Sequence, residues 1–233
     1  MSEKILIIDC GSQYTQLIAR RVRELNVYCE IHSFEISLAS ILKYKPKGII
    51  ISGGPDSVYG NSNLNNLGKI FTLEIPVLGI CFGMQLIAKF FGGEVQESKT
   101  REFGYAEVRL RGHSNLFTGI EDRKNNDGNA FLDVWMSHGD SVVKLPDKFK
   151  VIASNKDTPL AGIALEEKKI YGLQFHPEVT HTKKGKLIIK KFISNICDTK
   201  QSWFISNFLN QSISEIKKTI KNEKVILGLS GGV

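Results

Sequence analysis

The first part of the chain alternates short apolar runs with longer segments of helical periodicity. The apolar runs are too short and too continuous for helices, and they are typical of strands buried on both faces. They cover residues 5–8, 27–32, 48–51 and 77–80. Helical spacing of apolar side chains is found between them, in residues 14–25, 36–44 and 84–91. The alternation predicts an α/β fold with a parallel sheet covered by helices on both faces.

The pattern changes after Gly93. The following apolar runs predict shorter, more antiparallel strands, at Val95 and in residues 106–110, 132–135, 151–153 and 163–165. A polar loop over residues 124–128 separates two of them. An apolar strand over 169–175 and a helix over 187–197 then restore the earlier pattern. Parallel sheets place their sites at the carboxyl ends of the strands, so we look for chemistry there.

The last part of the chain differs from what precedes it. A helical apolar stripe after Gln201 is followed by a buried-type strand over residues 225–229 and the glycine-rich residues 230–233. A strand needs partner strands. We therefore expect two units: a complete one over residues 1–198, and, over residues 199–233, a linker helix with the first strand of a further domain.

Composition narrows the class of protein. Hydrophobic residues make up 42% and charged residues 24%, as in globular domains. The net charge of +7 raises nucleic acid as a partner, but the basic residues are scattered singly and in pairs, which favours a solubilising surface. No apolar stretch approaches the length of a membrane span. The four cysteines show no metal-ligand or disulfide spacing, so we expect a cytoplasmic protein with reduced thiols and no metal site.

A cysteine between two glycines follows the apolar run at residues 77–80. Gly79 and Gly83 stand two residues before and two after Cys81, which permits the sharp strand-to-helix turn called a nucleophile elbow. Such a turn exposes the thiol at the sheet edge, where the N-terminus of the next helix favours thiolate. Taken alone, the pattern favours a nucleophile, although Cys81 could also be a small buried hydrophobic residue.

A histidine that could act as a base follows the strand predicted over 169–175. Pro177 biases His176 toward extended backbone, and residues i and i+2 of an extended chain point to one side. We therefore expect Glu178 to reach the His176 ring, fix its tautomer and stabilise the imidazolium. Together with Cys81 these residues have the roles of a catalytic triad, although His-Pro-Glu alone could be a surface turn.

Thiolate attack on a carbonyl creates an oxyanion, which needs preorganised backbone N–H donors. The N–H of Phe82, at the start of the predicted helix, is one candidate. Residues 52–55, Ser-Gly-Gly-Pro, could supply a second, because glycine lets the backbone approach a ligand closely. The same residues could also form a plain turn before Pro55.

Several segments together resemble a known family. Residues 79–85 and 174–178, GICFGMQ and QFHPE, resemble the class I glutamine amidotransferases. A closer resemblance, to the amidotransferase domain of the glutamine-hydrolysing GMP synthases, is carried by residues 9–16, 52–55, 101–106, 135–140 and 176–182. Residues 225–233 resemble the start of the ATP-pyrophosphatase domain of those enzymes. The resemblance implies a three-layer α/β/α open sheet, mostly parallel and flavodoxin-like.

The resemblance also implies a role for each matching residue. Cys81 would form a γ-glutamyl thioester, His176 would act first as base and then as acid, and Glu178 would orient His176. The backbone N–H groups of Gly54 and Phe82 would form the oxyanion hole. Glutamine would be held by Gln85, Ser137, His138, Gly139 and Asp140. The implied reaction converts L-glutamine and water into L-glutamate and ammonia, without a metal or organic cofactor in this domain.

For the complete enzymes the resemblance implies more. Ammonia would pass to an adenylated XMP intermediate to give GMP, with ATP and Mg²⁺, in a homodimer. Here Ser230, Gly231 and Gly232 match the start of the pyrophosphate loop, but the Asp and Ser that would follow are absent. We therefore expect glutaminase chemistry without ligase activity, and a synthetase partner on a separate chain or, preferably, in a removed C-terminal part.

Two positions depart from the family pattern, and two other functions stay open. Cys10 stands where an aromatic residue is usual, and it is interpreted as packing rather than as a regulatory thiol. Phe82 stands where tyrosine is frequent, which leaves the backbone donor unchanged. The same fold could serve a γ-glutamyl hydrolase or cysteine peptidase, or a binding module without activity. Gln85 and residues 137–140 favour free glutamine, and no nucleic-acid or membrane partner is expected.

Overall fold

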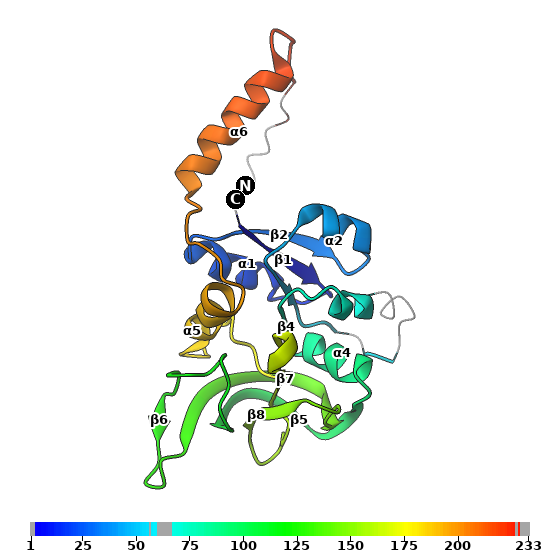
Figure 1. Ribbon diagram of the computed structural model, residues 1–233, viewed down its shortest axis with the longest axis vertical. Coiled ribbons are helices and arrows are strands. Elements are labelled where there is room, and N and C mark those ends of the chain that lie inside the picture. Colours follow the sequence, from blue (N-terminus) through cyan, green and yellow to red (C-terminus); the bar gives the residue numbers. More distant parts are fainter. Residues whose placement is uncertain (1–2, 56, 60–66, 227, 229–233) are drawn as a thin grey trace.

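The computed structural model describes residues 3–55, 57–59, 67–226 and 228. Within them, one ten-stranded sheet has the order β2-β1-β3-β4-β10-β9-β8-β5-β7-β6 (Figure 1). The strands β2, β1, β3, β4 and β10 pair in parallel and form what we call the parallel half. The remaining pairings are antiparallel, and the strands β9, β8, β5, β7 and β6 form the antiparallel half.

The parallel half follows the order 2-1-3-4-5 of flavodoxin-like sheets. Its strands are β1 (Lys4–Asp9), β2 (Tyr28–Ser33), β3 (Gly48–Ile51), β4 (Val77–Ile80) and β10 (Ile170–Leu173). Its helices are α1 (Thr15–Glu24), α2 (Leu38–Tyr44), η1 (Lys69–Thr72), α4 (Phe82–Phe90), α5 (Gly185–Lys190) and the π-helical η3 (Lys191–Ile196). The fold predicted from the apolar runs is confirmed.

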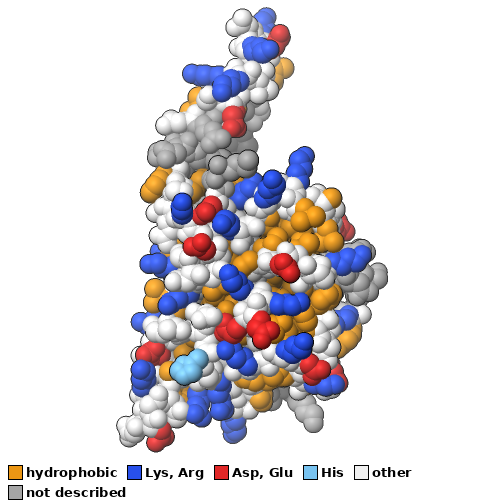
Figure 2. Space-filling model, in the orientation of Figure 1, with side chains coloured by type: hydrophobic (Ala, Val, Ile, Leu, Met, Phe, Trp, Pro, Cys, Tyr) orange, Lys and Arg blue, Asp and Glu red, His pale blue; other side chains and the backbone are white. Residues whose placement is uncertain are grey.

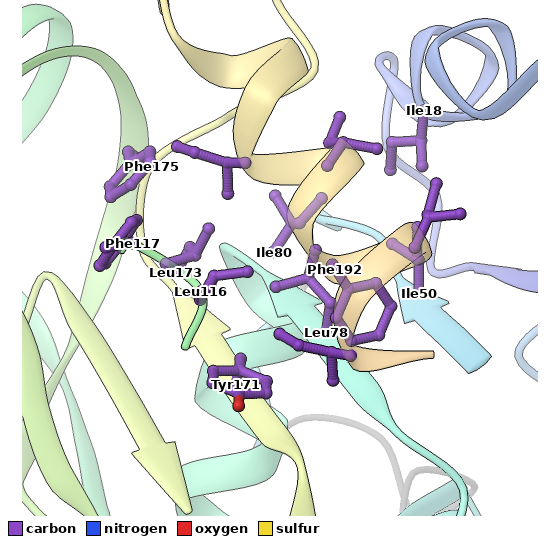
Figure 3. Packing of buried hydrophobic residues seen from close by; sticks show 14 of the residues in the cluster. Ile18, Ile50, Leu78, Ile80, Leu116, Phe117, Tyr171, Leu173, Phe175 and Phe192 are labelled. Atoms are coloured by element: carbon purple, nitrogen blue, oxygen red, sulfur yellow. The ribbon is translucent and has the colours of Figure 1, made fainter. Parts of the chain in front are cut away.

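Alternate residues of each buried strand divide the core into two layers. On β1, Ile5 and Ile7 pack with α1, α5 and η3, whereas Leu6 and Ile8 pack on the other face with α2, η1 and α4. Figure 3 shows members of the first layer, among them Phe192 of η3. Burial of both faces explains why these strands read as continuous apolar runs. The result is the expected three-layer α/β/α arrangement.

The antiparallel half contains two long strands that the sequence pattern did not predict. Its elements are β5 (Glu94–Leu110), β6 (Arg123–Lys124), β7 (Ala130–Lys144), β8 (Lys150–Ser154), β9 (Gly162–Leu165) and η2 (Glu166–Lys168). The prediction of short strands was wrong for β5 and β7, which have 17 and 15 residues. They pair along almost their full lengths with two register shifts. Exposed and polar side chains interrupt the apolar pattern there without interrupting backbone pairing.

The C-terminal segment stands apart from the sheet. Helix α6 (Ile205–Ile220), orange in Figure 1, projects away from the sheet, and Leu209, Ile213 and Ile216 are each about half exposed. The strand predicted over 225–229 is not formed by the described residues Val225, Ile226 and Gly228, and Ile226 is 98% exposed. No described strand pairs with them, so their backbone lacks the neighbour that a strand needs.

Charged side chains of both signs are interspersed on the face shown in Figure 2. Hydrophobic side chains gather on the same face over the region of α2 and α4. Among the described residues, no helix is long and apolar enough to cross a membrane.

Candidate active site

The carboxyl ends of the parallel strands surround a pocket of about 540 Å³. The chain leaves β1 for β2 on one side and returns to β3 on the other, and ligands bind in open α/β sheets at such a switch point. The lining side chains and backbone come from the ends of β1, β3 and β4, the loop after β10, and β5 and β7 of the antiparallel half. They are Gly11, Ser12, Gln13, Tyr14, Gly53, Gly54, Pro55, Ser57, Cys81, Gln85, Glu97, Phe103, Ser137, His138, Gly139, Asp140 and His176.

Cys81 occupies a strained turn between β4 and α4. Its φ of 51° and ψ of −105° lie where non-glycine residues are rarely found, as expected of a nucleophile elbow. Small neighbours make the turn possible: a Cβ at Gly79 would lie 2.5 Å from the Gly83 backbone, and one at Gly83 would lie 2.6 Å from the Ile51 carbonyl oxygen. Such strain persists only where the surrounding packing imposes it.

The thiol of Cys81 is 6% exposed and opens into the pocket. Its Sγ lies 3.6 Å from the carbonyl oxygen of Ser137, and Nε2 of Gln174 lies 3.7 Å from the same sulfur. Phe82 is the first residue of α4, so its N–H is one of the helix N-terminal donors without an intrahelical acceptor. The helix N-terminus thus directs positive potential toward Cys81.

His176 and Glu178 form a buried pair beside Cys81. Nδ1 of His176 lies 2.7 Å from Oε1 of Glu178, and the two residues are 3% and 0% exposed. Their contact was predicted from an extended backbone, but Pro177 and Glu178 lie in a turn. The turn is fixed by Arg21, whose Nε donates to the Glu178 carbonyl oxygen, and by Thr182, whose hydroxyl donates to the His176 carbonyl oxygen.

The electrostatics of His176 favour an imidazolium. Burial disfavours its charge, but contacts with Cys81 and Glu178 outweigh burial and raise the pKa to about 10. Nε2 of His176 has no hydrogen-bond partner among the described residues, so it can exchange a proton within the pocket. A Cβ built on Gly53 would lie 3.3 Å from Cε1 of His176 and 3.6 Å from Cβ of Cys81, which places all three residues around one point.

The loop after β3 brings backbone close to this point. The Ser52 hydroxyl accepts from the Cys10 N–H at 2.9 Å and donates to the Gly53 carbonyl oxygen at 2.7 Å. A Cβ at Gly54 would lie 2.5 Å from the Cys10 carbonyl oxygen, so only glycine fits. The loops that follow β1 and β3 are therefore locked together, and Gly53 and Gly54 both line the pocket.

The residues expected to hold a substrate lie on the opposite wall. Gln85 and all of residues 137–140 line the pocket. Nε2 of Gln85 donates to the Asp140 carbonyl oxygen at 2.8 Å, and Nδ1 of His138 lies 3.1 Å from that oxygen. Burial lowers the pKa of His138 despite the neighbouring Glu102, so its ring is largely neutral at pH 7. This wall belongs to β7 and α4.

Sequence reasoning gave no role to several residues that the fold places here. Gln174, 0% exposed, approaches both Cys81 and Gln85. Glu102 contacts His138, and Tyr14 packs edge-on against the His176 ring with centroids 5.2 Å apart. All three stand within segments that carry the family resemblance, which was the available signal, but their contacts are long-range and no local pattern reveals them.

The other three cysteines are also buried, and none of them lines the pocket. Burial raises the pKa of Cys10 to about 12 and that of Cys29 to about 11, and it also raises the pKa of Cys197. They are therefore poor nucleophiles near neutral pH. Among the described residues, no group of three or more His, Cys, Asp or Glu side chains could hold a metal ion. Ser230, Gly231 and Gly232, expected to bind pyrophosphate, lie outside the described residues.

Comparison with known proteins agrees with this geometry. The family model described as glutamine amidotransferase class-I matches residues 6–196. The chain is 53% identical over 233 residues to a glutamine-hydrolyzing GMP synthase of Methylobacillus flagellatus, covering 100% of this chain and 44% of that protein. It is 54% identical over 231 residues to the Azoarcus protein of the same name, covering 99% of this chain and 44% of that protein. The chain therefore spans less than half the length of these relatives.

A solved structure gives the same result for the fold. The crystal structure of a Thermoplasma acidophilum protein, described as one of the subunits of a GMP synthase, superposes with a TM-score of 0.76 at 33% identity. The match covers 94% of this chain and 98% of that one. With the family model matching residues 6–196, the chain belongs to the class I glutamine amidotransferase family.

Proposed function

We propose that this chain hydrolyses L-glutamine to L-glutamate and ammonia. The observation that carries the proposal is the placement of Cys81, on a strained elbow, beside the buried His176–Glu178 pair in one pocket. A thiol, a base and an orienting carboxylate are the groups that acyl transfer through a thioester requires. Gln85 and residues 137–140 give the pocket the polar wall that a free amino acid needs.

The first half of the reaction forms a thioester. The Cys81 thiolate attacks the γ-carbonyl carbon of glutamine, and the oxyanion is stabilised by the N–H groups of Gly54 and Phe82. The C–N bond then breaks as the His176 imidazolium gives its proton to the leaving nitrogen, which departs as ammonia. The Glu178 carboxylate accepts the N–H of Nδ1, so one ring proton stays on Nδ1 and Nε2 is the nitrogen that gives and takes the mobile proton.

The second half consumes water. His176, now neutral, takes a proton from a water molecule that attacks the thioester carbonyl, again through an oxyanion at the same donors. The C–S bond breaks, glutamate leaves, and the thiolate–imidazolium pair is restored. The balance is one glutamine and one water consumed for one glutamate and one ammonia released.

The test is ammonia release from glutamine by the purified chain and by Cys81→Ala. We expect the substitution to lower the rate at least about a thousandfold, because the nucleophile is lost while the fold remains. The matched control is Cys29→Ala, which removes a buried thiol with a raised pKa and should leave the rate unchanged. Turnover retained in Cys81→Ala would exclude Cys81 as the nucleophile. Faster release from γ-glutamyl peptides than from glutamine would favour a γ-glutamyl hydrolase.

For the longer protein we propose that the ammonia aminates XMP to give GMP. Relatives at 53% and 54% identity carry the name GMP synthase and are more than twice as long as the matched region. In this proposal residues 1–198 are the glutaminase unit, and residues 199–233 lead into an ATP-pyrophosphatase domain that begins with Ser230, Gly231 and Gly232. ATP and Mg²⁺ serve that domain, the glutaminase unit uses no cofactor, and the complete enzyme is a cytoplasmic homodimer.

This larger proposal is tested by adding the synthetase part with ATP and XMP. The glutaminase rate of the chain should rise, since uncoupled hydrolysis wastes glutamine, and GMP should appear in step with glutamate. An unchanged rate without GMP would contradict the coupling.

A further inference from the structure

We propose that Glu102 is a positioning residue of this site, which fixes the glutamine-holding residues 137–140 through His138. The inference rests on the proposed glutaminase function but concerns a residue to which that function assigns no part. Glu102 does not touch the reacting atoms, and it acts through other side chains. It lies on β5, directly opposite His138 on β7 in the strand register.

The Glu102 carboxylate is a junction between three segments of the antiparallel half. Its Oε2 lies 3.2 Å from Nε2 of His138 and accepts from the Thr158 hydroxyl at 2.6 Å. Its Oε1 accepts from the Asn155 amide at 3.3 Å. Thr158 and Asn155 belong to the turn between β8 and β9. Charge-assisted hydrogen bonds of this kind are stronger than neutral ones, so the carboxylate ties that turn to β7.

The position of Glu102 in the strand makes this tie necessary. The register of β5 against β7 shifts between Glu97 and Glu102, so Glu102 and His138 form the first regular pair after the irregularity. Residues 137–140, expected to hold a substrate, span the irregularity, because His138 pairs with Glu102 on one side of it and Asp140 pairs with Glu97 on the other. A side-chain contact at the edge of a register shift holds strand residues whose position backbone pairing alone defines less well.

His138 connects the Glu102 carboxylate to the backbone of Asp140, one of the residues expected to hold a substrate. Its side chain is 1% exposed, and its two ring nitrogens face the Glu102 carboxylate and the Asp140 carbonyl oxygen. Both partners are acceptors, and a neutral ring has only one N–H to offer. The group that faces Nε2 therefore decides which ring nitrogen carries the proton, and with it whether Nδ1 can donate to the Asp140 carbonyl oxygen.

A continuous set of contacts leads from there to the nucleophile. The Asp140 carbonyl oxygen also accepts from Nε2 of Gln85, which lies 3.4 Å from Oε1 of Gln174. Nε2 of Gln174 lies 3.7 Å from Sγ of Cys81. Gln85 and Gln174 are both buried. A displacement of the Asp140 carbonyl therefore disturbs Gln85 and residues 137–140 directly, and it disturbs Cys81 only through Gln174.

The proposal predicts a defect in substrate binding that exceeds the defect in turnover. Glu102→Ala should raise the KM for glutamine about 10-fold to 100-fold, the range expected for losing charge-assisted hydrogen bonds, with a smaller fall in kcat. Thr158→Val, which removes one donor to the carboxylate, should raise KM less, and the double variant should resemble Glu102→Ala because both act through one group. Glu94→Ala is the matched control on the same strand, where Glu94 forms a half-exposed ion pair with Lys144.

The measurements are kcat and KM from ammonia release, together with the melting temperature. A KM within about twofold of the parent in folded Glu102→Ala, with Glu94→Ala equally unchanged, would overturn the proposal. If Glu102→Ala does not fold, Thr158→Val decides: a raised KM supports the proposal and an unchanged KM overturns it. Equal rises in Glu102→Ala and Glu94→Ala would also overturn it, because a general strand defect would then explain both.

Glutamine binding to the chain carrying Cys81→Ala, measured by calorimetry, separates this inference from the proposed function. Weaker binding after Glu102→Ala in that background supports the inference even if the parent chain releases no ammonia, in which case only the proposed function fails. Normal hydrolysis with binding unaffected by Glu102→Ala overturns the inference alone.

Discussion

The two halves of the sheet contribute different things to one pocket. The parallel half provides the elbow with Cys81, the loop with Gly54, and the buried His176–Glu178 pair after β10. The antiparallel half provides residues 137–140 and the polar contacts of Glu102 and His138. The groups proposed to react thus come from the ends of short buried strands. Of the groups proposed to hold glutamine, residues 137–140 come from the long strand β7 and Gln85 comes from α4.

The difference follows from how each half is held. The parallel strands β1, β3, β4 and β10 are buried on both faces, so packing fixes them tightly enough to impose a strained backbone at Cys81. The antiparallel strands keep exposed side chains such as Phe103 and Tyr105, at 67% and 66%, and depend more on hydrogen bonds and ion pairs. The proposed chemistry therefore lies in the half that is held mainly by packing, and the proposed substrate contacts of residues 137–140 lie in the half with more exposed strands.

The largest expected effect tests the division of work within the parallel half. His176→Ala should lower kcat by about 10³-fold or more with little change in KM, because the proton donor and acceptor is removed. Glu178→Gln should lower kcat less, since it perturbs the orientation of His176 and leaves the imidazole in place. Ammonia release under saturating glutamine measures both. Equal losses would show that the carboxylate does more than orient, and a change confined to KM would contradict the division between halves.

A smaller effect compares glycines of the two halves. Gly83→Ala brings a Cβ within 2.6 Å of the Ile51 carbonyl oxygen, and overpacking against backbone should cost about 2–3 kcal/mol. Gly128→Ala, near the β6–β7 turn, meets nothing within 4 Å but has a φ of 77°, which should cost about 1 kcal/mol. Thermal melting should fall by about 5–10 °C for the first and about 2–4 °C for the second. The reverse order would contradict tighter packing in the parallel half.

The last effect depends on pH and on the two buried histidines. The pKa of His176 is raised to about 10, above the value of about 6.5 in an unfolded chain. Its protonation therefore stabilises the fold fully below about pH 6.5, and this contribution is lost as pH rises toward 10. His138, with a lowered pKa, acts in the opposite sense, because the fold loses stability as pH falls below about 6.5.

The melting temperature of the parent and of Glu178→Gln, followed from pH 6 to pH 10, measures the first of these contributions. The two values should differ most at the acid end and converge toward the alkaline end, because the His176 ring of the parent loses its proton as pH approaches 10. A difference that grows with pH would contradict the raised pKa of His176. His138→Asn should instead reduce the loss of stability below pH 6.5.

Local sequence patterns predicted the structure correctly where interactions between neighbouring residues determine it. The runs at residues 5–8, 48–51 and 77–80 gave β1, β3 and β4, because strands buried on both faces must be continuously apolar. The glycines around Cys81 gave the elbow, because their spacing is a property of the turn itself. The lengths of β5 and β7 were missed, since exposed strands need no apolar repeat.

The sequence by itself determined the alternating α/β order, the placement of Cys81 between two glycines, and the family to which the chain belongs. Only the tertiary structure decided that Glu102, His138, Gln85 and Gln174 form one set of contacts ending at Cys81. The physical reason is the separation along the chain of the residues that interact. Turns and buried strands are specified by neighbouring residues, whereas these hydrogen bonds join residues that are far apart in the chain and meet only after the two halves of the sheet have packed.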